Sequence, residues 1–166
     1  MHPPARREFS LASVLLLVAA VLAASAPAGA QTPVAPADET AVLKVVDGVV
    51  KALDDADANA FTSFFAADAT LFFPLASLPL RLEDRQQIGA AFGAFFDAVR
   101  RGRPAPPYMN LVPVGTKVQL LGSVAVVTFH FAGEEMVSRR TLVLQKSSGK
   151  WLIVHLHASN LQVEKK

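Results

Sequence analysis

The sequence predicts an α+β domain in which the helices come first and an antiparallel sheet follows. In the first half of the chain, apolar residues recur at the three- and four-residue spacing of amphipathic helices. In the second half, four long segments rich in β-branched and aromatic residues are separated by short turns, which is typical of antiparallel hairpins. The expected arrangement packs three N-terminal helices on one face of a curved, mostly antiparallel sheet.

Residues 1–30 have the features of a secretory signal peptide. Arg6 and Arg7 supply the positive start, residues 11–24 are apolar, and Ala28-Gly29-Ala30 offers the small residues that signal peptidase accepts. The alternative is an uncleaved membrane anchor, but a spanning helix needs about 20 consecutive apolar residues and this stretch is shorter. We therefore expect an exported protein, periplasmic or secreted, that has no membrane association after cleavage.

The length of the remaining chain suits a single domain with its own core. Residues 31–37 are small and polar with two prolines and predict a flexible lead-in, residues 38–162 form the domain, and residues 163–166 form a C-terminal tail. The absence of cysteine excludes disulfides and thiolate chemistry. The formal net charge is only +2 despite a pI near 9.2, so the composition does not indicate nucleic-acid binding.

Three helices are expected in the first half. The first spans residues 38–53, where the apolar positions share one face. A short second helix carries Phe61, and a brief strand over residues 69–73 follows it. The third helix, residues 83–101, has the strongest apolar repeat, and Gly102 is a natural stop for it.

Four strands are expected in the second half. They cover residues 110–121, 124–131, 137–146 and 151–161. The turns between them fall at Gly122-Ser123, Ala132-Gly133 and Ser147-Ser148-Gly149.

The order of these elements, together with the run Gly-Lys-Trp-Leu-Ile-Val-His-Leu-His-Ala-Ser over residues 149–159, resembles the nuclear transport factor 2-like superfamily. Within it, the chain is similar to the SnoaL-like branch and to the association domain of calcium/calmodulin-dependent protein kinase II, which ends in a similar run. The stretch from Asp57 to Ala69 also resembles the second-helix signature of these proteins. The resemblance covers residues 38–162.

The resemblance implies a cone-shaped sheet wrapped around a pocket, with the long helix across its mouth. It also implies a homodimer or a larger ring formed through the outer face of the sheet. The charged pocket positions of the kinase association domain fall here on Phe73, Phe92, His130, Leu142 and Ala158, so a largely apolar pocket is expected. The expected ligand-binding residues are Phe73, Phe92, Thr128, His130, Leu142, Val154, Leu156 and Ala158.

His130 is the first candidate for catalysis. By strand alternation it shares a face with Val126 and Thr128, and if this face lines the cone, His130 is its most polar group. An imidazole can act as acid or base near neutral pH. The alternative is a half-buried histidine with one satisfied hydrogen bond.

Three further residues are catalytic candidates, each with a structural alternative. Arg140 could recognise a carboxylate or an enolate at the cone rim, or it could be a solvated strand end. Tyr108 could donate a hydrogen bond to an oxyanion, or it could lie in a rim loop. Asp68 could act as general base, or it could cap the second helix or its turn.

His155 and His157 share one face of the last strand, a spacing that can hold zinc. A metal also needs a third ligand, and none is evident in the sequence, so no metal is expected. Alternation places both histidines on the outer face together with Trp151, Ile153 and Ser159, where a subunit interface is expected.

These observations support two classes of function and leave open whether the protein is an enzyme. The first is an exported module that binds a small apolar ligand or forms homo-oligomers. The alternative is a cofactor-independent isomerase or dehydratase that acts on a small apolar carbonyl compound, with His130 as acid or base. In a third interpretation, side chains fill the pocket and the domain serves oligomerisation alone. No cofactor and no nucleic-acid partner are expected.

Overall fold

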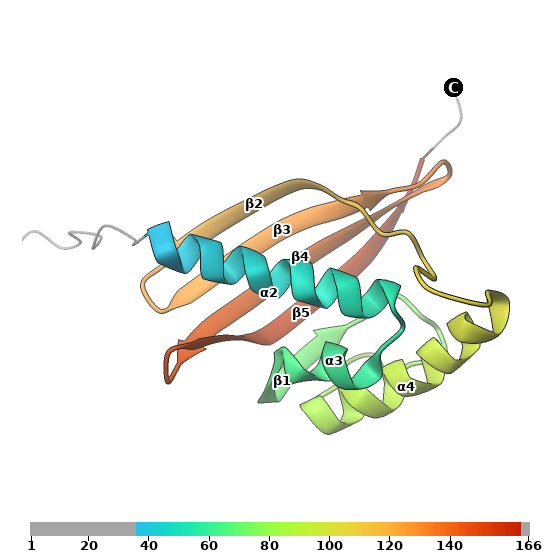
Figure 1. Cartoon of the computed structure of the whole chain (residues 1–166), viewed down its shortest axis with the longest axis horizontal. Helices are drawn as coiled ribbons and strands as arrows, with labels where there is room; N and C mark the ends of the chain where they lie inside the picture. Colours follow the sequence, from blue (N-terminus) through green and yellow to red (C-terminus); the bar gives the residue numbers. More distant parts are fainter. Residues whose placement is uncertain (1–35, 164–166) are drawn as a thin grey trace, which may run out of the picture. The chain divides into compact units, whose positions relative to one another are not determined.

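The computed structural model describes residues 36–163, in which three helices pack on a five-stranded sheet (Figure 1). The helices are α2 (Pro36–Asp54), α3 (Ala58–Ser63) and α4 (Arg85–Gly102). The strands are β1 (Phe65–Phe72), β2 (Pro113–Leu121), β3 (Val124–Ala132), β4 (Met136–Ser147) and β5 (Lys150–Gln162). The signal peptide expected at residues 1–30 lies outside the described residues. No helix within 36–163 is long and apolar enough to cross a membrane.

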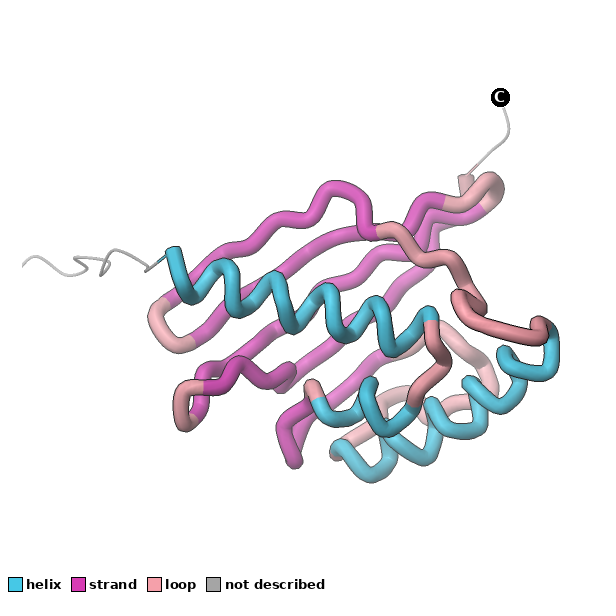
Figure 2. Tube along the Cα trace, in the orientation of Figure 1, coloured by secondary structure: helices cyan, strands magenta, loops and turns pink. Residues whose placement is uncertain are grey.

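The sheet has the strand order β1-β5-β4-β3-β2. Strands β2 to β5 form an antiparallel meander, and β1 pairs with β5 in parallel. Figure 2 shows the strands side by side with the helices over one face of the sheet. Gly122 and Gly149 lie in two of the hairpin turns with φ values of 64° and 78°, in the left-handed region that glycine adopts at little cost. The α+β fold and its hairpins, expected from the sequence, are confirmed.

Helix α2 crosses the inner face of the sheet, and α3 and α4 lie beside each other next to β1 (Figure 1). The Lys146 ammonium and the Trp151 indole N–H donate to Asp38 Oδ1 at 2.5 and 3.2 Å, which ties the start of α2 to the β4–β5 hairpin. These hydrogen bonds, that from Lys146 first, hold the pKa of Asp38 below its ordinary value.

Helix α4 begins where the sequence predicts an N-terminus. Asp84 is the N-cap, and its Oδ1 accepts a hydrogen bond from the backbone N–H of Gln87 at 2.8 Å. The apolar repeat buries Ile88, Phe92 and Phe96. Because the Phe92 ring stacks on the Phe61 ring with centroids 4.4 Å apart, α3 and α4 share one aromatic core.

Strand β1 begins at Phe65, four residues before the strand expected over residues 69–73. The reason lies in another part of the chain. Ile153 in β5 donates its N–H to the Phe64 carbonyl at 2.9 Å and pairs with Phe65, so the chain enters the sheet immediately after α3. Such pairing is a tertiary effect that local propensity does not report.

A β-bulge in β5 changes which residues face the core. Val143 pairs with His155, but Leu144 pairs with Ile153, so Val154 is an extra residue in the ladder. The extra residue reverses the inward and outward alternation at that point. As a result Trp151 and Ile153 are buried in the core, which corrects the expectation that they lie on the outer face with His155.

Candidate functional site

The helices and the inner face of the sheet enclose an apolar cavity. The residues that line it come from all three helices, from β3, β4 and β5, and from the loop after β1. They are Val49, Leu53, Phe61, Phe73, Phe92, Phe129, Phe131, Arg140, Leu142 and Leu156. The volume is about 10 Å³, about the space that one water molecule needs, so side chains fill most of the interior.

Arg140 is the charged residue of this lining. Its guanidinium carbon lies 5.5 Å from the centroid of the Phe73 ring and 5.3 Å from that of Phe131, so two aromatic rings flank the cation. Nη1 donates to Ser138 Oγ at 3.0 Å and to the Arg139 carbonyl at 2.8 Å. Within residues 36–163, no protein acceptor is bound to Nε or Nη2, and no carboxylate pairs with this guanidinium.

Burial lowers the pKa of Arg140 to about 10. Desolvation disfavours the charged form, and no carboxylate offsets that effect. The guanidinium still carries its charge at neutral pH. The cavity lining therefore includes a cation that is largely shielded from water. Two of its donor nitrogens, Nε and Nη2, have no acceptor in the described part of the protein.

The structure brings together five of the residues expected to form the site. Phe73, Phe92, Arg140, Leu142 and Leu156 all line the cavity. They come from four separate segments of the chain, which the fold joins around the middle of β4. The geometry thus assembles an aromatic and aliphatic chamber with one cationic group.

His130 and Thr128 do not line this cavity, which corrects the expected orientation of β3. In this strand the buried residues are Ala125, Val127, Phe129 and Phe131. Thr128 and His130 alternate with them and lie on the opposite face of the sheet. His130 instead lies beside Gly115 of β2 on the outer face.

Val154 and Ala158 also lie outside the cavity lining. Val154 is the extra residue of the bulge and is half-buried. Ala158 is buried on the inner face and pairs with Arg140 across the strands, but its methyl group does not reach the cavity.

Tyr108 and Asp68 are not brought to the cavity either. Tyr108 packs partly buried against the core, and its backbone N–H donates to the Asp54 carbonyl at 2.7 Å. Asp68 is an exposed residue within β1 rather than a cap of the turn after α3, because β1 starts earlier than expected.

Sequence reasoning missed half of the lining. The missed residues are Val49, Leu53, Phe61, Phe129 and Phe131. For β3 the signal was present: large apolar residues at 127, 129 and 131 alternate with a threonine and a histidine, which is the pattern of a strand with one buried face.

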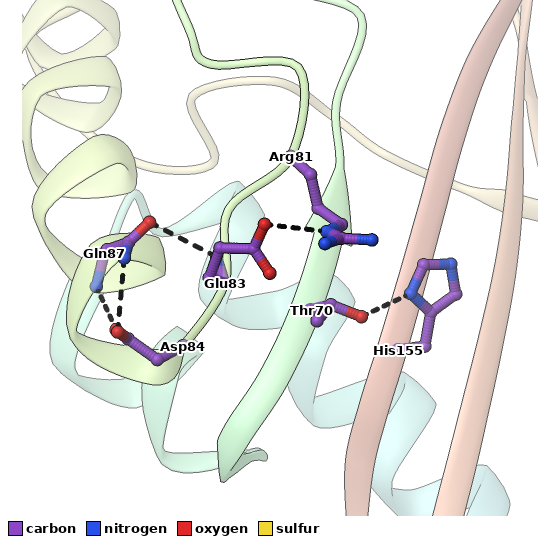
Figure 3. Close-up of polar contacts among 6 residues, drawn as sticks. All are labelled: Thr70, Arg81, Glu83, Asp84, Gln87 and His155. Atoms are coloured by element: carbon purple, nitrogen blue, oxygen red, sulfur yellow. Dashed lines mark hydrogen bonds and ion pairs between the residues drawn. The ribbon is translucent and has the colours of Figure 1, made fainter.

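His155 belongs to a cluster of polar side chains on the outer face of the sheet. Its Nδ1 lies 2.8 Å from the Thr70 hydroxyl, and nearby Arg81 donates to Glu83 at 2.9 Å (Figure 3). Burial first, and then the charges of His157 and Arg81, lower the pKa of His155. Its imidazole is therefore kept in the neutral form more than that of an ordinary histidine.

A larger, open hollow of about 460 Å³ lies between α2 and the segment before β2, away from Arg140. Three of its four charged groups are already engaged, and the fourth, Asp47, is an exposed residue of α2. Lys51 forms an ion pair with Asp55 at 2.5 Å, and Asp54 Oδ1 accepts from the Leu111 N–H at 2.9 Å. This hollow offers no group comparable with the unpaired Arg140.

Solved structures with the same fold come from several bacteria. A nuclear transport factor 2-like protein of unknown function from Pseudomonas putida KT2440 is 18% identical with a TM-score of 0.62, covering 74% of this chain and 86% of its own. A candidate calcium/calmodulin-dependent protein kinase II association domain from Xanthomonas campestris is 24% identical with a TM-score of 0.53, covering 80% and 93%. A candidate ketosteroid isomerase from Parabacteroides distasonis ATCC 8503 is 22% identical with a TM-score of 0.54, covering 72% and 85%. At these identities the similarity shows the fold alone.

No curated protein matches the chain. The model of the SnoaL-like domain family matches residues 42–163, which includes the core of α2, the aromatic cluster and the whole sheet. The order of the elements, the parallel β1–β5 pair and the helix-covered inner face agree with that match. The chain therefore belongs to the SnoaL-like domain family, and its fold is that of nuclear transport factor 2-like proteins.

Proposed function

We propose that the protein is an exported binding module for a small organic anion, whose apolar body enters the aromatic interior while its anionic group binds Arg140. The observation that supports this most is the Arg140 guanidinium between Phe73 and Phe131, which lacks a carboxylate partner in the described chain. A charged group held in an apolar setting without a counter-ion lowers the stability of the fold, and such groups are characteristic of binding sites.

The geometry of Arg140 suits a carboxylate. Because both of its protein hydrogen bonds use Nη1, Nε and Nη2 are left for a ligand. A carboxylate can accept from two guanidinium nitrogens at once, and such paired contacts are stronger than neutral hydrogen bonds. The surrounding phenyl rings would contact the apolar part of the ligand.

Binding requires a side chain to move, because the cavity holds only about 10 Å³. Phe73 is the best candidate. It lines the cavity and also lines an open hollow of about 290 Å³ formed by residues 73–80. A rotation of this ring would join the two spaces and admit a ligand beside Arg140.

The enzyme alternative finds less support. Among the described residues that line the cavity, none is a histidine, aspartate or glutamate, so the general base of an isomerase has no place there. His130 lies on the opposite face of the sheet. One similar structure is a candidate ketosteroid isomerase. A direct assay on enolisable apolar ketones would test isomerase activity in this protein.

Homo-oligomerisation is the second candidate function, and the tight interior favours it. A chamber filled by its own side chains suits a domain whose role is assembly. The exposed outer face of the sheet would then contact a second copy in a homodimer or a larger ring. Native mass spectrometry of protein purified gently from its own compartment would show a bare oligomer without a bound small molecule.

Calorimetric titration with octanoate and with octanamide tests the proposed anion site. The two ligands share an apolar chain, and only the first can form an ion pair with Arg140. We expect octanoate to bind at least about tenfold more tightly than octanamide, and we expect Arg140→Gln to remove that preference. The matched control is Arg101→Gln, which deletes an exposed arginine at the end of α4 and should leave the preference intact. Equal affinity for both ligands in the unaltered protein would reject the proposal.

A further inference from the structure

The outer face of the sheet carries its own hollow, separate from the interior cavity. It measures about 380 Å³ and is lined by Arg139, Thr141, His157 and Ser159. The strand register explains why these four side chains meet. Arg139 pairs with Ser159 and Thr141 pairs with His157, two residues further along each strand, so all four share one face.

All four side chains can donate hydrogen bonds. The guanidinium offers a planar fork, each hydroxyl offers one O–H, and the imidazole has an N–H in either charge state. Within residues 36–163, no hydrogen bond or ion pair engages the Arg139 side chain, and the His157 ring contacts the Phe72 ring rather than a polar group. The donors therefore face the hollow without a protein acceptor.

The strands around the hollow carry basic residues and no acidic ones. Strands β2 to β5 contain no aspartate or glutamate. The register places His130 beside Arg139 on one side, while His155 lies two residues from His157 along β5. Acidic residues of the adjoining segments are not part of its lining: Asp68 lies on β1, Glu134 and Glu135 in the β3–β4 hairpin, and Glu83 forms an ion pair with Arg81.

We propose that this hollow binds a phosphate group, either as the free ion or as the phosphate of a small organic ester. A carboxylate has two oxygens, whereas a phosphate has at least three and can accept from more of these donors at once. Arginine recognises phosphate through its fork, and hydroxyl and imidazole donors complete a cradle around the remaining oxygens. The absence of acidic groups from these strands removes the repulsion that an anion would otherwise meet.

Phe72 extends the site toward an organic ester. It pairs with His157 across the parallel β1–β5 contact, and the two ring centroids are 5.7 Å apart. Its side chain is 36% exposed although it is large and apolar. An aromatic group attached to the bound phosphate could stack on this ring.

The site does not depend on the proposed function of the interior. Arg139 and Arg140 point to opposite faces of the sheet, so an organic anion at Arg140 and a phosphate at Arg139 would bind to different surfaces. Each proposal can fail without the other.

Titration of the purified protein with inorganic phosphate at constant pH and ionic strength tests the proposal, with calorimetry or amide NMR shifts as the readout. We expect saturable binding that weakens about tenfold in Arg139→Gln. His157→Gln should weaken it by a smaller factor. The control Lys44→Gln removes the same charge from an exposed residue of α2 and should leave the affinity unchanged. Phenyl phosphate should bind more tightly than inorganic phosphate, and Phe72→Ala should abolish that gain.

Several results would overturn the proposal. One is an absence of saturable binding by either phosphate. Another is an equal loss in Arg139→Gln and Lys44→Gln, which would mean that net charge alone attracts the ion. Acetate binding as tightly as phosphate at the same ionic strength would reject the phosphate assignment. Circular dichroism of each variant establishes that the fold is intact, which is expected because Arg139 and His157 are exposed.

Discussion

Arg139 and Arg140 are neighbours in the sequence, yet one lines a hollow on the outer face of the sheet and the other lines the interior cavity. Strand alternation separates them, with the sheet between their guanidinium groups. The two cations therefore have different environments: Arg139 is open to water, and Arg140 lies against two phenyl rings. Two substitutions at adjacent positions can report on two faces of the molecule.

Replacing Arg140 by methionine should stabilise the protein while it abolishes binding of an organic anion. The substitution removes a desolvated charge, whose pKa burial has lowered to about 10, and fills its place with an apolar side chain. The lost contacts with Phe73 and Phe131 offset part of the gain. We expect the free energy of unfolding to rise by roughly 0.5–2 kcal/mol in urea denaturation. A fall in stability would mean that Arg140 serves the fold rather than a ligand.

Replacing Phe73 by alanine should open the interior. The ring is half-buried, so the cost in unfolding free energy should be roughly 2 kcal/mol, below that of a fully buried phenylalanine. If Phe73 closes the cavity, octanoate should associate faster with the variant in stopped-flow measurements. Phe95→Ala, which shortens a neighbouring half-buried ring outside the cavity lining, is the control. An unchanged association rate in Phe73→Ala would place the access route elsewhere.

Leu142 lines the cavity and is fully buried. Leu142→Ala should lower the free energy of unfolding by about 2–5 kcal/mol and enlarge the chamber. Leu142→Arg should abolish binding of an apolar ligand, because it introduces a second cation into the same space. Thermal unfolding identifies folded preparations of each variant. A folded Leu142→Arg protein with unchanged affinity would reject the assignment of the pocket.

The pKa of His155 makes stability depend on pH. Burial, His157 and Arg81 lower this pKa from its ordinary value of 6.5, so just below pH 6.5 the unfolded chain binds the proton more readily than the folded chain does. The contribution of His155 to stability is therefore complete above pH 6.5 and is lost as the pH falls through the folded-state pKa. In urea titrations from pH 7.5 to pH 5, His155→Gln should flatten the decline, since glutamine does not titrate and can still form a hydrogen bond with Thr70. An identical slope in both proteins would contradict this account.

A homodimer through the outer face would be sensitive to pH. In a two-fold interface the same surface meets itself, so one copy would bring its outer-face side chains close to the same side chains of the other. These are His130, Arg139, His155 and His157. Imidazoles gain positive charge as the pH falls, so the dimer should weaken at acid pH. Sedimentation at pH 7.5 and pH 5 measures this. A dimer of equal stability at both values would argue against an interface on this face.

Much of the fold could be predicted from the sequence, because its local patterns are strong. The repeat that buries Ile88, Phe92 and Phe96 defines α4, and the turns at Gly122 and Gly149 define the hairpins. The early start of β1 could not be predicted in this way. It depends on a hydrogen bond from Ile153, which is almost ninety positions away in the chain.

The candidate site was only partly predictable. Phe73, Phe92, Leu142 and Leu156 were expected in the pocket and line the cavity. The expected orientation of β3 was wrong, because a pocket position of the related domain aligns with His130, whereas the apolar pattern around Phe129 turns that histidine outward. Whether an arginine at a strand end is solvated or flanked by rings depends on Phe73 and Phe131, which the fold brings from two other segments.

The bulge at Val154 lets β5 change in length without changing which side chains face the core. On either side of it, the inward residues are Ile153 and Leu156, an odd and an even position. Removing this one valine would join Ile153 to His155 and leave a regular alternation, with Leu156 and Ala158 still inward and His155 and His157 still outward. A codon deletion at Val154 should therefore be tolerated better than one within β3, whose ladder with β4 has no bulge and whose two faces would be exchanged beyond the deletion. Evolution could then shorten this strand at the bulge and keep its two faces.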